Sequence, residues 1–292
     1  MDRLMGPIVV GGVGGSGTRV VAEILSKFGF YLGNDLNGAS DNLLYTLLFK
    51  RPRWFYRNFN NSHEISKGIN LFYKLMFGHN SPSLPELIFL TRAIGSMSLF
   101  GHNLQGGGRG LWFTKRIQRA FAEKHFNSQY IGWGWKEPNS HLLIEHLAEH
   151  FTHFKYIHTI RHGLDMAFSK NQQQLYNWGT FYNIKPPKSV SEEPKASLKY
   201  WIGANKRVFD LAKKFGENRI LIINYDNLCV FPESGVQKLL DFLGLEAEQK
   251  AYSEAICLPR VPYSKGRYNL EDIRQFDNGD LLCLEKLGFT VE

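Results

Sequence analysis

A cluster of glycines near the N-terminus has the spacing of a loop that binds a phosphate group. It lies in the stretch VVGGVGGSGTR (9–19), where Ser16 interrupts the glycines and Thr18 and Arg19 follow them. Glycine lets the backbone approach an anion closely, and N–H groups at the start of a helix attract negative charge. The stretch therefore predicts an anion-binding loop between a strand and a helix. Its glycines are Gly11, Gly12, Gly14, Gly15 and Gly17.

The loop alone fits two further nucleotide-binding patterns. Gly12-x-Gly14-x-x-Gly17 matches the dinucleotide fingerprint, which requires an acidic residue roughly 20 positions later at the end of a strand. Asp35 lies near that place, but GFYLGND (29–35) makes a poor strand. Gly12-x4-Gly17-Thr18 resembles a triphosphate loop without its lysine, and Asp226 would then be the acid for Mg²⁺. Both alternatives stay open on this motif alone.

A second motif, RHGLDMAFS (161–169), contains another candidate phosphate site. Arg161 directly follows a predicted strand and offers a planar, charged donor for a phosphate. Ser169 lies about two helical turns further on if a helix begins near Gly163. Asp165 is placed to form an ion pair with Arg161. The motif predicts that Arg161 and Ser169 contact one anion.

Strands alternate with helices along the chain, which predicts a mostly parallel sheet. The strands are expected at 7–11, 130–136, 154–160 and 219–225, and helices at 17–28, from about 139, from about 163, and at 233–243 ending at Gly244. Ligands bind beyond the carboxyl ends of such strands. The residues that follow the strands are the glycine loop, Lys136, Arg161 and Tyr225-Asp226. This cationic set suits a polyanionic ligand.

The whole chain, residues 1–292, is expected to form one domain. Residues 41–126 are predicted to be mostly helical, with a break at 101–110. Residues 177–197 are rich in Pro, Ser and Lys and are predicted to be a loop. A basic loop from Pro259 precedes a final helix that runs into 287–289.

Composition indicates a folded protein with an anionic partner. The chain has 292 residues, 43% hydrophobic and 21% charged, with a net charge of +8. The charge favours an anionic partner without identifying it. The three cysteines are far apart and fit neither a disulfide framework nor a metal site, which favours a reducing cytoplasm. No signal peptide, anchor or membrane-spanning run is expected.

Taken together and in order, these motifs resemble the sulfotransferase family. The shared features are GGSGT (14–18), WKEP (135–138), RHGLDMAFS, ILIINYDNL (220–228), PESGVQKLLDFLGL (232–245) and KGRY (265–268). The resemblance implies a three-layer α/β/α sandwich, similar to P-loop nucleoside-triphosphate hydrolases, with a helical insertion over about 41–126. It also implies 3′-phosphoadenosine 5′-phosphosulfate as the sulfuryl donor and no metal.

The resemblance also implies roles for individual residues. Gly14, Gly15, Ser16, Gly17, Thr18 and Arg19 would bind the 5′-phosphosulfate, and Tyr225 would approach the adenine. Arg161 and Ser169 would bind the 3′-phosphate, over which Lys265, Gly266 and Arg267 would close. Adenosine 3′,5′-bisphosphate would be the product. A small-molecule or glycan acceptor is expected, and no nucleic acid.

One departure from the family concerns the charge at the sulfuryl group. Many members have Lys or Arg directly before Ser-Gly-Thr, where this chain has Gly15. A cation is still required to stabilise the transferring group, and Arg19 and Lys136 are the candidates.

The acceptor hydroxyl also needs a base. Asp41 is the first candidate, although it could instead cap a helix. Its rivals are Asp35, Glu137 and His141.

Two other patterns compete with this interpretation. His146-Leu147-Ala148-Glu149-His150 matches the H-x-x-E-H zinc pattern, but local enrichment in histidine makes a chance match easy. The basic aromatic cluster 50–57 could contact nucleic acid, be half core and half solvated face, or line the acceptor site. The same alternatives hold for Trp112 and Phe113. A P-loop kinase-like phosphotransferase and a non-enzymatic nucleotide- or nucleic-acid-binding protein are therefore the alternative functions.

Overall fold

The computed structural model describes residues 5–78, 81–100, 109–122 and 129–291. The chain divides into two compact units. The first comprises Met1–Val9, Gly29–Glu137 and Leu143–Phe154, and the second comprises Val10–Phe28, Pro138–Leu142 and Lys155–Glu292. The boundary falls inside the first strand, between Val9 and Val10. The single-domain organisation stays a prediction.

The strands form one five-stranded parallel sheet in the order β2-β3-β1-β4-β5. Their bounds are β1 Met5–Gly12, β2 Phe30–Tyr31, β3 Gly132–Lys136, β4 Lys155–Ile160 and β5 Ile220–Asn224. Phe30 pairs with Gly132 in the first unit, and Tyr156 pairs with Ile220 in the second. Continuous apolar runs are typical of strands buried on both faces, and Val9 and Val10 are fully buried. The predicted α/β class is confirmed.

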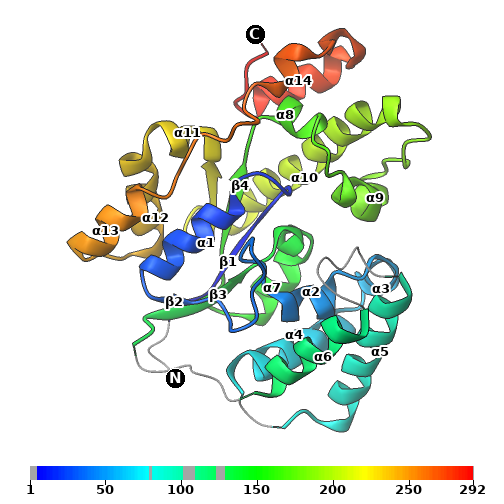
Figure 1. Cartoon of the computed structure of the whole chain (residues 1–292), viewed down its shortest axis with the longest axis vertical. Helices are drawn as coiled ribbons and strands as arrows, with labels where there is room; N and C mark the ends of the chain where they lie inside the picture. The colour runs from blue at the N-terminus through cyan, green and yellow to red at the C-terminus, as the bar shows by residue number, and fades with distance from the viewer. Residues whose placement is uncertain (1–4, 79–80, 101–108, 123–128, 292) are drawn as a thin grey trace. The chain divides into compact units, whose positions relative to one another are not determined.

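The first unit has five helices between β2 and β3, within the described residues, and one helix after β3. They are α2 Leu43–Phe49, α3 Pro52–Asn58, α4 Ser62–Phe77, α5 Leu84–Phe100, α6 Arg109–Phe121 and α7 Ile144–His150. Helix α4 packs against α2, α5 and α6 (Figure 1). Aromatic side chains fill this core, where Trp135 of β3 stacks on Tyr45 and meets Phe72 edge-on. The predicted break at 101–110 lies mostly outside the described residues, and its last two residues already belong to α6.

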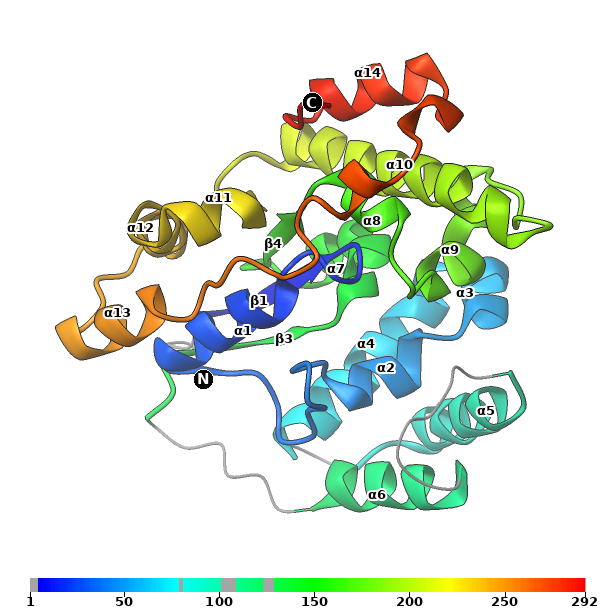
Figure 2. The same cartoon turned by 45° about the horizontal axis from the view of Figure 1, so that its top comes forward.

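The second unit contains α1 and the helices that follow β4. They are α1 Thr18–Lys27, α8 Gly163–Ala167, α9 Gln173–Trp178, α10 Glu193–Phe215, α11 Tyr225–Val230, α12 Pro232–Leu243, α13 Gln249–Ile256 and α14 Asn278–Lys286. Helix α10 packs against α8 and α14, and α1 packs against α13 (Figure 2). Short 3₁₀ turns occupy Pro138–Leu143, Gly179–Tyr182, Val190–Glu192, Arg267–Leu270 and Ile273–Gln275.

Two boundary predictions are wrong for identifiable reasons. The loop predicted over 177–197 contains the end of α9 and the start of α10, which begins at Glu193. Pro194 lies in the first turn of α10, where proline is compatible with a helix, so it marks a helix start rather than a loop. Helix α8 begins at Gly163 as predicted but ends at Ala167, so Ser169 does not lie on a second turn of this helix.

No helix within the described ranges combines the length and the apolar character needed to cross a bilayer. The cytoplasmic location stays a prediction. The three cysteines, Cys229, Cys257 and Cys283, are free thiols.

Candidate functional site

The glycine loop of the second unit joins β1 to α1 through backbone conformations that favour glycine. Gly15 and Gly17 have φ values of 94° and 90°. A Cβ atom on Gly17 would lie 2.1 Å from the ring of Tyr225, so a side chain cannot be accommodated there without displacing that ring. Tyr225 follows β5, and its hydroxyl donates to the carbonyl of Arg260 at 3.2 Å. Burial raises the pKa of the Tyr225 phenol. The loop and Tyr225 therefore pack directly against each other.

The loop presents donors that suit an anion. Gly17 caps α1 without a side-chain hydrogen bond, and the first turn of α1 contains no acidic residue. Because the first N–H groups of a helix have no partner within the helix, they can donate to a bound anion. Ser16 is fully buried and its hydroxyl lies 2.8 Å from that of Thr159 on β4. These features fit a phosphate or sulfate group at the start of α1.

An amide pair beside the loop was not predicted from the sequence. The Gly14 N–H donates to Gln174 Oε1 at 2.5 Å. The amide nitrogen of Gln174 in turn donates to Asn139 Oδ1 at 2.7 Å. Gln174 belongs to α9 and is 160 positions from Gly14, so no local sequence pattern connects them. The pair orients the Gly14 peptide.

Gly15 stands where many family members have a cation, and its surroundings disfavour a lysine side chain. Its backbone has a positive φ, and an added Cβ atom would lie 3.1 Å from Met166 Cε. Arg19 has a side chain that is 58% exposed, and its guanidinium lies 3.6 Å from Glu23 one turn along α1. The backbone thus disfavours a side chain at position 15, and Arg19 is engaged at the surface.

Arg161 forms the centre of a buried charged cluster in the second unit. It directly follows β4, and its side chain is 5% exposed. Its guanidinium donates to Asp165 Oδ2 at 3.1 Å and to the Ser264 hydroxyl at 3.0 Å. Asp226 Oδ1 lies 3.8 Å from Arg161 Nε. The expected Arg161–Asp165 pair is present, and sequence reasoning missed Ser264 as a partner.

The segment 264–268, here called the strap, lies against this cluster. The Gly266 N–H donates to Asp165 Oδ2 at 3.0 Å, and Arg267 donates to the carbonyl of Phe168 at 3.2 Å. Tyr268 stacks on His162 with ring centroids 4.5 Å apart. The structure therefore brings the predicted Gly266 and Arg267 together with Arg161. The backbone N–H of Lys265 donates to the carbonyl of Pro262.

Ser169 follows α8 in this same unit. Its hydroxyl accepts from the N–H of Asn171 at 3.3 Å, and Gln172 donates to its carbonyl at 2.7 Å. Its side chain is half-buried. No hydrogen bond between Ser169 and Arg161 occurs in the described structure, so their shared anion stays a prediction.

The first unit contains a second buried cation, Lys136, at the end of β3. Its side chain is 3% exposed and its ammonium group lies 2.5 Å from Asp41 Oδ1. The ammonium also donates to the carbonyl of Ala39 at 3.0 Å. The N–H of Asn42 donates to the carbonyl of Lys136, which fixes this loop to the strand end. The candidate cation and the candidate base are therefore in direct contact.

The prediction that Asp41 could cap a helix is wrong, because Asn42 caps α2 through its side chain. The rival acids have other partners. Asp35 pairs with Arg116 and Arg119. Glu137 is 1% exposed and lies 4.0 Å from Lys50.

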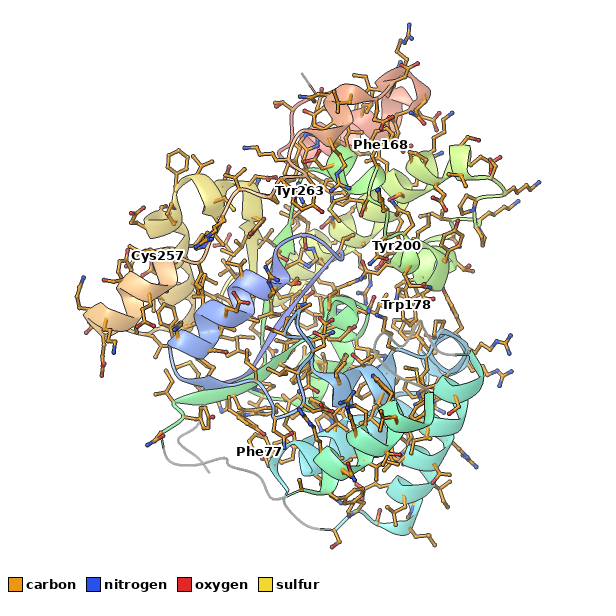
Figure 3. The ribbon with its side chains drawn as sticks, viewed as in Figure 1. Phe77, Phe168, Trp178, Tyr200, Cys257 and Tyr263 are labelled. Atoms are coloured by element: carbon orange, nitrogen blue, oxygen red, sulfur yellow. The ribbon has the colours of Figure 1, made fainter. Side chains whose placement is uncertain are left out.

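His141 is the remaining rival base, and it belongs to the second unit. It is fully buried, and burial lowers its pKa well below the ordinary value. Its ring nitrogens lie 3.2 Å from the Tyr182 hydroxyl and 3.4 Å from the Tyr200 hydroxyl. Tyr200 lies on α10 (Figure 3).

The competing motifs have local partners. His146 Nε2 lies 2.8 Å from the carbonyl of Phe59, and no cluster of three His, Cys, Asp or Glu side chains that could hold a metal ion occurs within the described ranges.

In the basic aromatic cluster 50–57, Arg51 is buried and its guanidinium lies over the Trp54 ring at 4.4 Å, while Phe55 is 1% exposed. Burial lowers the pKa of Arg51 to about 9. Arg51 and Phe55 thus belong to the first unit's core, while Arg53, Tyr56 and Arg57 are exposed. Trp112 stacks edge-on against Phe113 within α6.

The acid required by the triphosphate-loop alternative is committed elsewhere. Asp226 Oδ2 accepts from the N–H of His162 at 3.2 Å, and its other oxygen faces Arg161. The acid required by the dinucleotide alternative, Asp35, is paired with arginines of α6. The structure therefore supports neither the triphosphate pattern nor the dinucleotide pattern with the acidic residue that each requires.

The chain resembles known proteins over most of its length. The model of the sulfotransferase family matches residues 7–249. The sulfotransferase domain from the curacin biosynthetic pathway is 12% identical, with 99% of this chain and 100% of that chain covered and a TM-score of 0.54. The sulfotransferase domain from the Synechococcus PCC 7002 olefin synthase is 14% identical, with 99% and 97% covered and a TM-score of 0.49. No curated protein matches by sequence. The chain belongs to the sulfotransferase family.

Proposed function

We propose that this sulfotransferase uses 3′-phosphoadenosine 5′-phosphosulfate as its donor. The observation that supports this most is the presence of two separate anion-binding arrangements in the second unit. One is the glycine loop at the start of α1, and the other is Arg161 with the strap. A donor with a phosphosulfate at one end and a 3′-phosphate at the other needs both. The acceptor is a hydroxyl or amine of a small molecule or glycan.

The proposed donor-binding roles follow the motifs. Gly14, Gly15, Ser16, Gly17 and Thr18 bind the 5′-phosphosulfate, and Tyr225 contacts the adenine. The 3′-phosphate is bound by Arg161, Ser169, Lys265, Gly266 and Arg267. Gln174 and Asn139 support the loop by orienting the Gly14 peptide.

The proposed chemistry assigns Lys136 and Asp41 to the transfer itself. The acceptor oxygen forms a bond to sulfur while the bond between sulfur and the bridging phosphate oxygen breaks. The acceptor proton passes to Asp41, and adenosine 3′,5′-bisphosphate leaves with the electron pair. Lys136 stabilises the charge that develops on the sulfuryl and bridging oxygens. We favour Lys136 over Arg19 because the Arg19 side chain is exposed and paired with Glu23.

A turnover experiment tests this function. The protein is incubated with ³⁵S-labelled donor and a mixture of phenol, alcohol, amine and oligosaccharide acceptors, with EDTA present. We expect transfer of label to an acceptor and stoichiometric release of adenosine 3′,5′-bisphosphate. Phosphoryl transfer from ATP that requires Mg²⁺, without sulfuryl transfer, would support the kinase-like alternative instead. Binding of the bisphosphate with steep salt dependence and no turnover would support the non-enzymatic alternative.

A further inference from the structure

One carboxylate oxygen in the second unit joins Arg161 to the strap. Asp165 is 1% exposed. Its Oδ2 atom accepts from Arg161 at 3.1 Å and from the backbone N–H of Gly266 at 3.0 Å. Both donors therefore bind the same buried oxygen. Gly266 lies 101 positions from Asp165 along the chain.

The strap contacts the same region at three further points. Ser264 accepts from Arg161, Arg267 donates to the carbonyl of Phe168, and Tyr268 stacks on His162. The chain on both sides of the strap extends into solvent, since Tyr263 is fully exposed and Leu270 is 90% exposed. Figure 3 labels Tyr263 and Phe168 in the second unit. The strap is thus a surface segment with a buried polar attachment.

The attachment couples two groups energetically. A buried carboxylate that loses a hydrogen-bond donor retains the cost of its desolvation, which exceeds the worth of an ordinary hydrogen bond. Release of the Gly266 N–H would leave Asp165 Oδ2 with Arg161 as its remaining partner among the described residues. Movement of Arg161 away from this position would also remove its hydrogen bond to Ser264 of the strap. The positions of the strap and of the guanidinium are therefore linked.

We propose that Asp165 is a positioning residue of the 3′-phosphate site, which makes the strap and Arg161 bind the phosphate as one unit. The proposal rests on the donor assigned above and deepens it. A ligand with a 3′-phosphate benefits from both the guanidinium and the strap. A ligand without that phosphate gains nothing from the coupling.

A simpler role for Asp165 would be to neutralise the charge of Arg161. Asp226 provides the matched comparison, because it faces the same guanidinium at 3.8 Å and accepts from the N–H of His162. None of its contacts described above involves the strap. Asp165→Asn and Asp226→Asn each remove one negative charge near Arg161, but only the first alters the strap attachment.

Hydrogen exchange of the free protein tests the coupling without any ligand. We expect Asp165→Asn to accelerate amide exchange in the peptide covering 264–268 by at least about tenfold, and Asp226→Asn to leave it near the wild-type rate. Unchanged strap exchange in Asp165→Asn would overturn the proposal. If Asp165→Asn fails to fold, Asp165→Glu keeps the charge but displaces the carboxylate oxygens from Gly266 and should show the same acceleration to a smaller degree. Unchanged exchange in that variant would then overturn the proposal.

Calorimetric titration tests the consequence for binding. Asp165→Asn should weaken binding of adenosine 3′,5′-bisphosphate by about tenfold or more while changing adenosine 5′-phosphate by less than about threefold. Equal losses for the two ligands would overturn the positioning role. If the wild-type protein binds both ligands equally, the proposed donor is wrong, and the exchange experiment still decides whether the strap depends on Asp165.

Discussion

Arg161 in the second unit and Lys136 in the first are both buried cations at the ends of strands, yet their surroundings differ. Arg161 faces two carboxylates and a serine hydroxyl. Among the described residues, Lys136 contacts one carboxylate, Asp41, and one carbonyl. Asp41 is 21% exposed, whereas Asp165 is 1% exposed. One cation is enclosed by fixed partners, and the other has a single partially exposed acid.

This difference suggests that the two cations have different roles. A planar guanidinium with several fixed hydrogen bonds suits constant binding of a phosphate. An ammonium group has three donors on a flexible stem and can exchange one partner for another as charge develops. We therefore assign binding to Arg161 and stabilisation of the transferring group to Lys136.

Lys136→Met should have the largest effect. We expect kcat to fall about 10²–10³-fold with bisphosphate affinity changed by less than about threefold, because the lost interaction acts on the developing charge. The measurement is release of adenosine 3′,5′-bisphosphate from the donor with saturating acceptor mixture. Arg19→Met is the matched control and should retain most of the rate. A larger loss in Arg19→Met would reverse the assignment.

Acid should destabilise the second unit through His158. This residue is fully buried and lies 2.8 Å from Asn205 Oδ1 and 3.2 Å from the Tyr156 hydroxyl. Burial lowers its pKa to about 4. Between the ordinary pKa of about 6.5 and this value the unfolded state binds more protons, so stability falls as pH falls, by up to about 3 kcal/mol.

Urea unfolding at pH 7 and pH 4.5 measures this effect. His158→Gln keeps a polar group at this position and should reduce the loss of stability between the two pH values. The same pH dependence in the variant and the wild type would show that His158 does not contribute.

Arg161→Lys tests whether the geometry of the guanidinium matters in addition to its charge. We expect binding of adenosine 3′,5′-bisphosphate to weaken about 10–100-fold, since lysine keeps the charge but lacks the planar set of donors. Adenosine 5′-phosphate, measured by the same calorimetry, should be affected far less. Full affinity in Arg161→Lys would mean that Arg161 acts only as a charge and would remove the contrast with Lys136.

Gly15→Lys tests whether a loop cation could replace Lys136. The positive φ and the contact with Met166 should destabilise the protein by about 1–2 kcal/mol. We expect no increase in turnover if Lys136 supplies the charge, as proposed. Urea unfolding and the bisphosphate-release rate measure the two effects. Turnover restored in the Lys136→Met background by Gly15→Lys would instead show that the two positions are interchangeable.

Gln174→Ala should have the smallest effect. Loss of the acceptor for the Gly14 N–H should raise KM for the donor about 3–10-fold with little change in kcat, because the loop peptide loses its orientation. Gln173→Ala is the matched control on the same helix, since Gln173 donates to Asn177 within α9. Equal KM values in the two variants would remove Gln174 from the site.

The sequence was most informative where function depends on local spacing. The glycine loop, Arg161 after β4 and Lys136 after β3 lie at strand ends as predicted, because apolar runs and turn residues mark strand ends. The Arg161–Asp165 pair could also be predicted, since the two residues lie four positions apart in the sequence.

The contacts that join distant segments could not be predicted from local sequence patterns. Gln174 meets Gly14 across 160 positions, and Ser264 meets Arg161 across 103. Each depends on how the second unit folds, and a lone glutamine or serine carries no signal of its partner. Asp226 could be identified as a polar residue after β5, but its contact with Arg161 could not. The start of α10 was missed because Pro194 was interpreted as a loop residue.

We propose that the second unit binds a nucleotide with a 3′-phosphate, and calorimetric titration of the wild-type protein gives the strongest test of that binding. In EDTA, adenosine 3′,5′-bisphosphate should bind with a Kd in the micromolar range or below, and adenosine 5′-phosphate at least about tenfold more weakly. ATP with Mg²⁺ should bind more weakly than the bisphosphate. Tight binding of ATP with Mg²⁺ together with no measurable binding of the bisphosphate would show that the second unit is not a site for this donor.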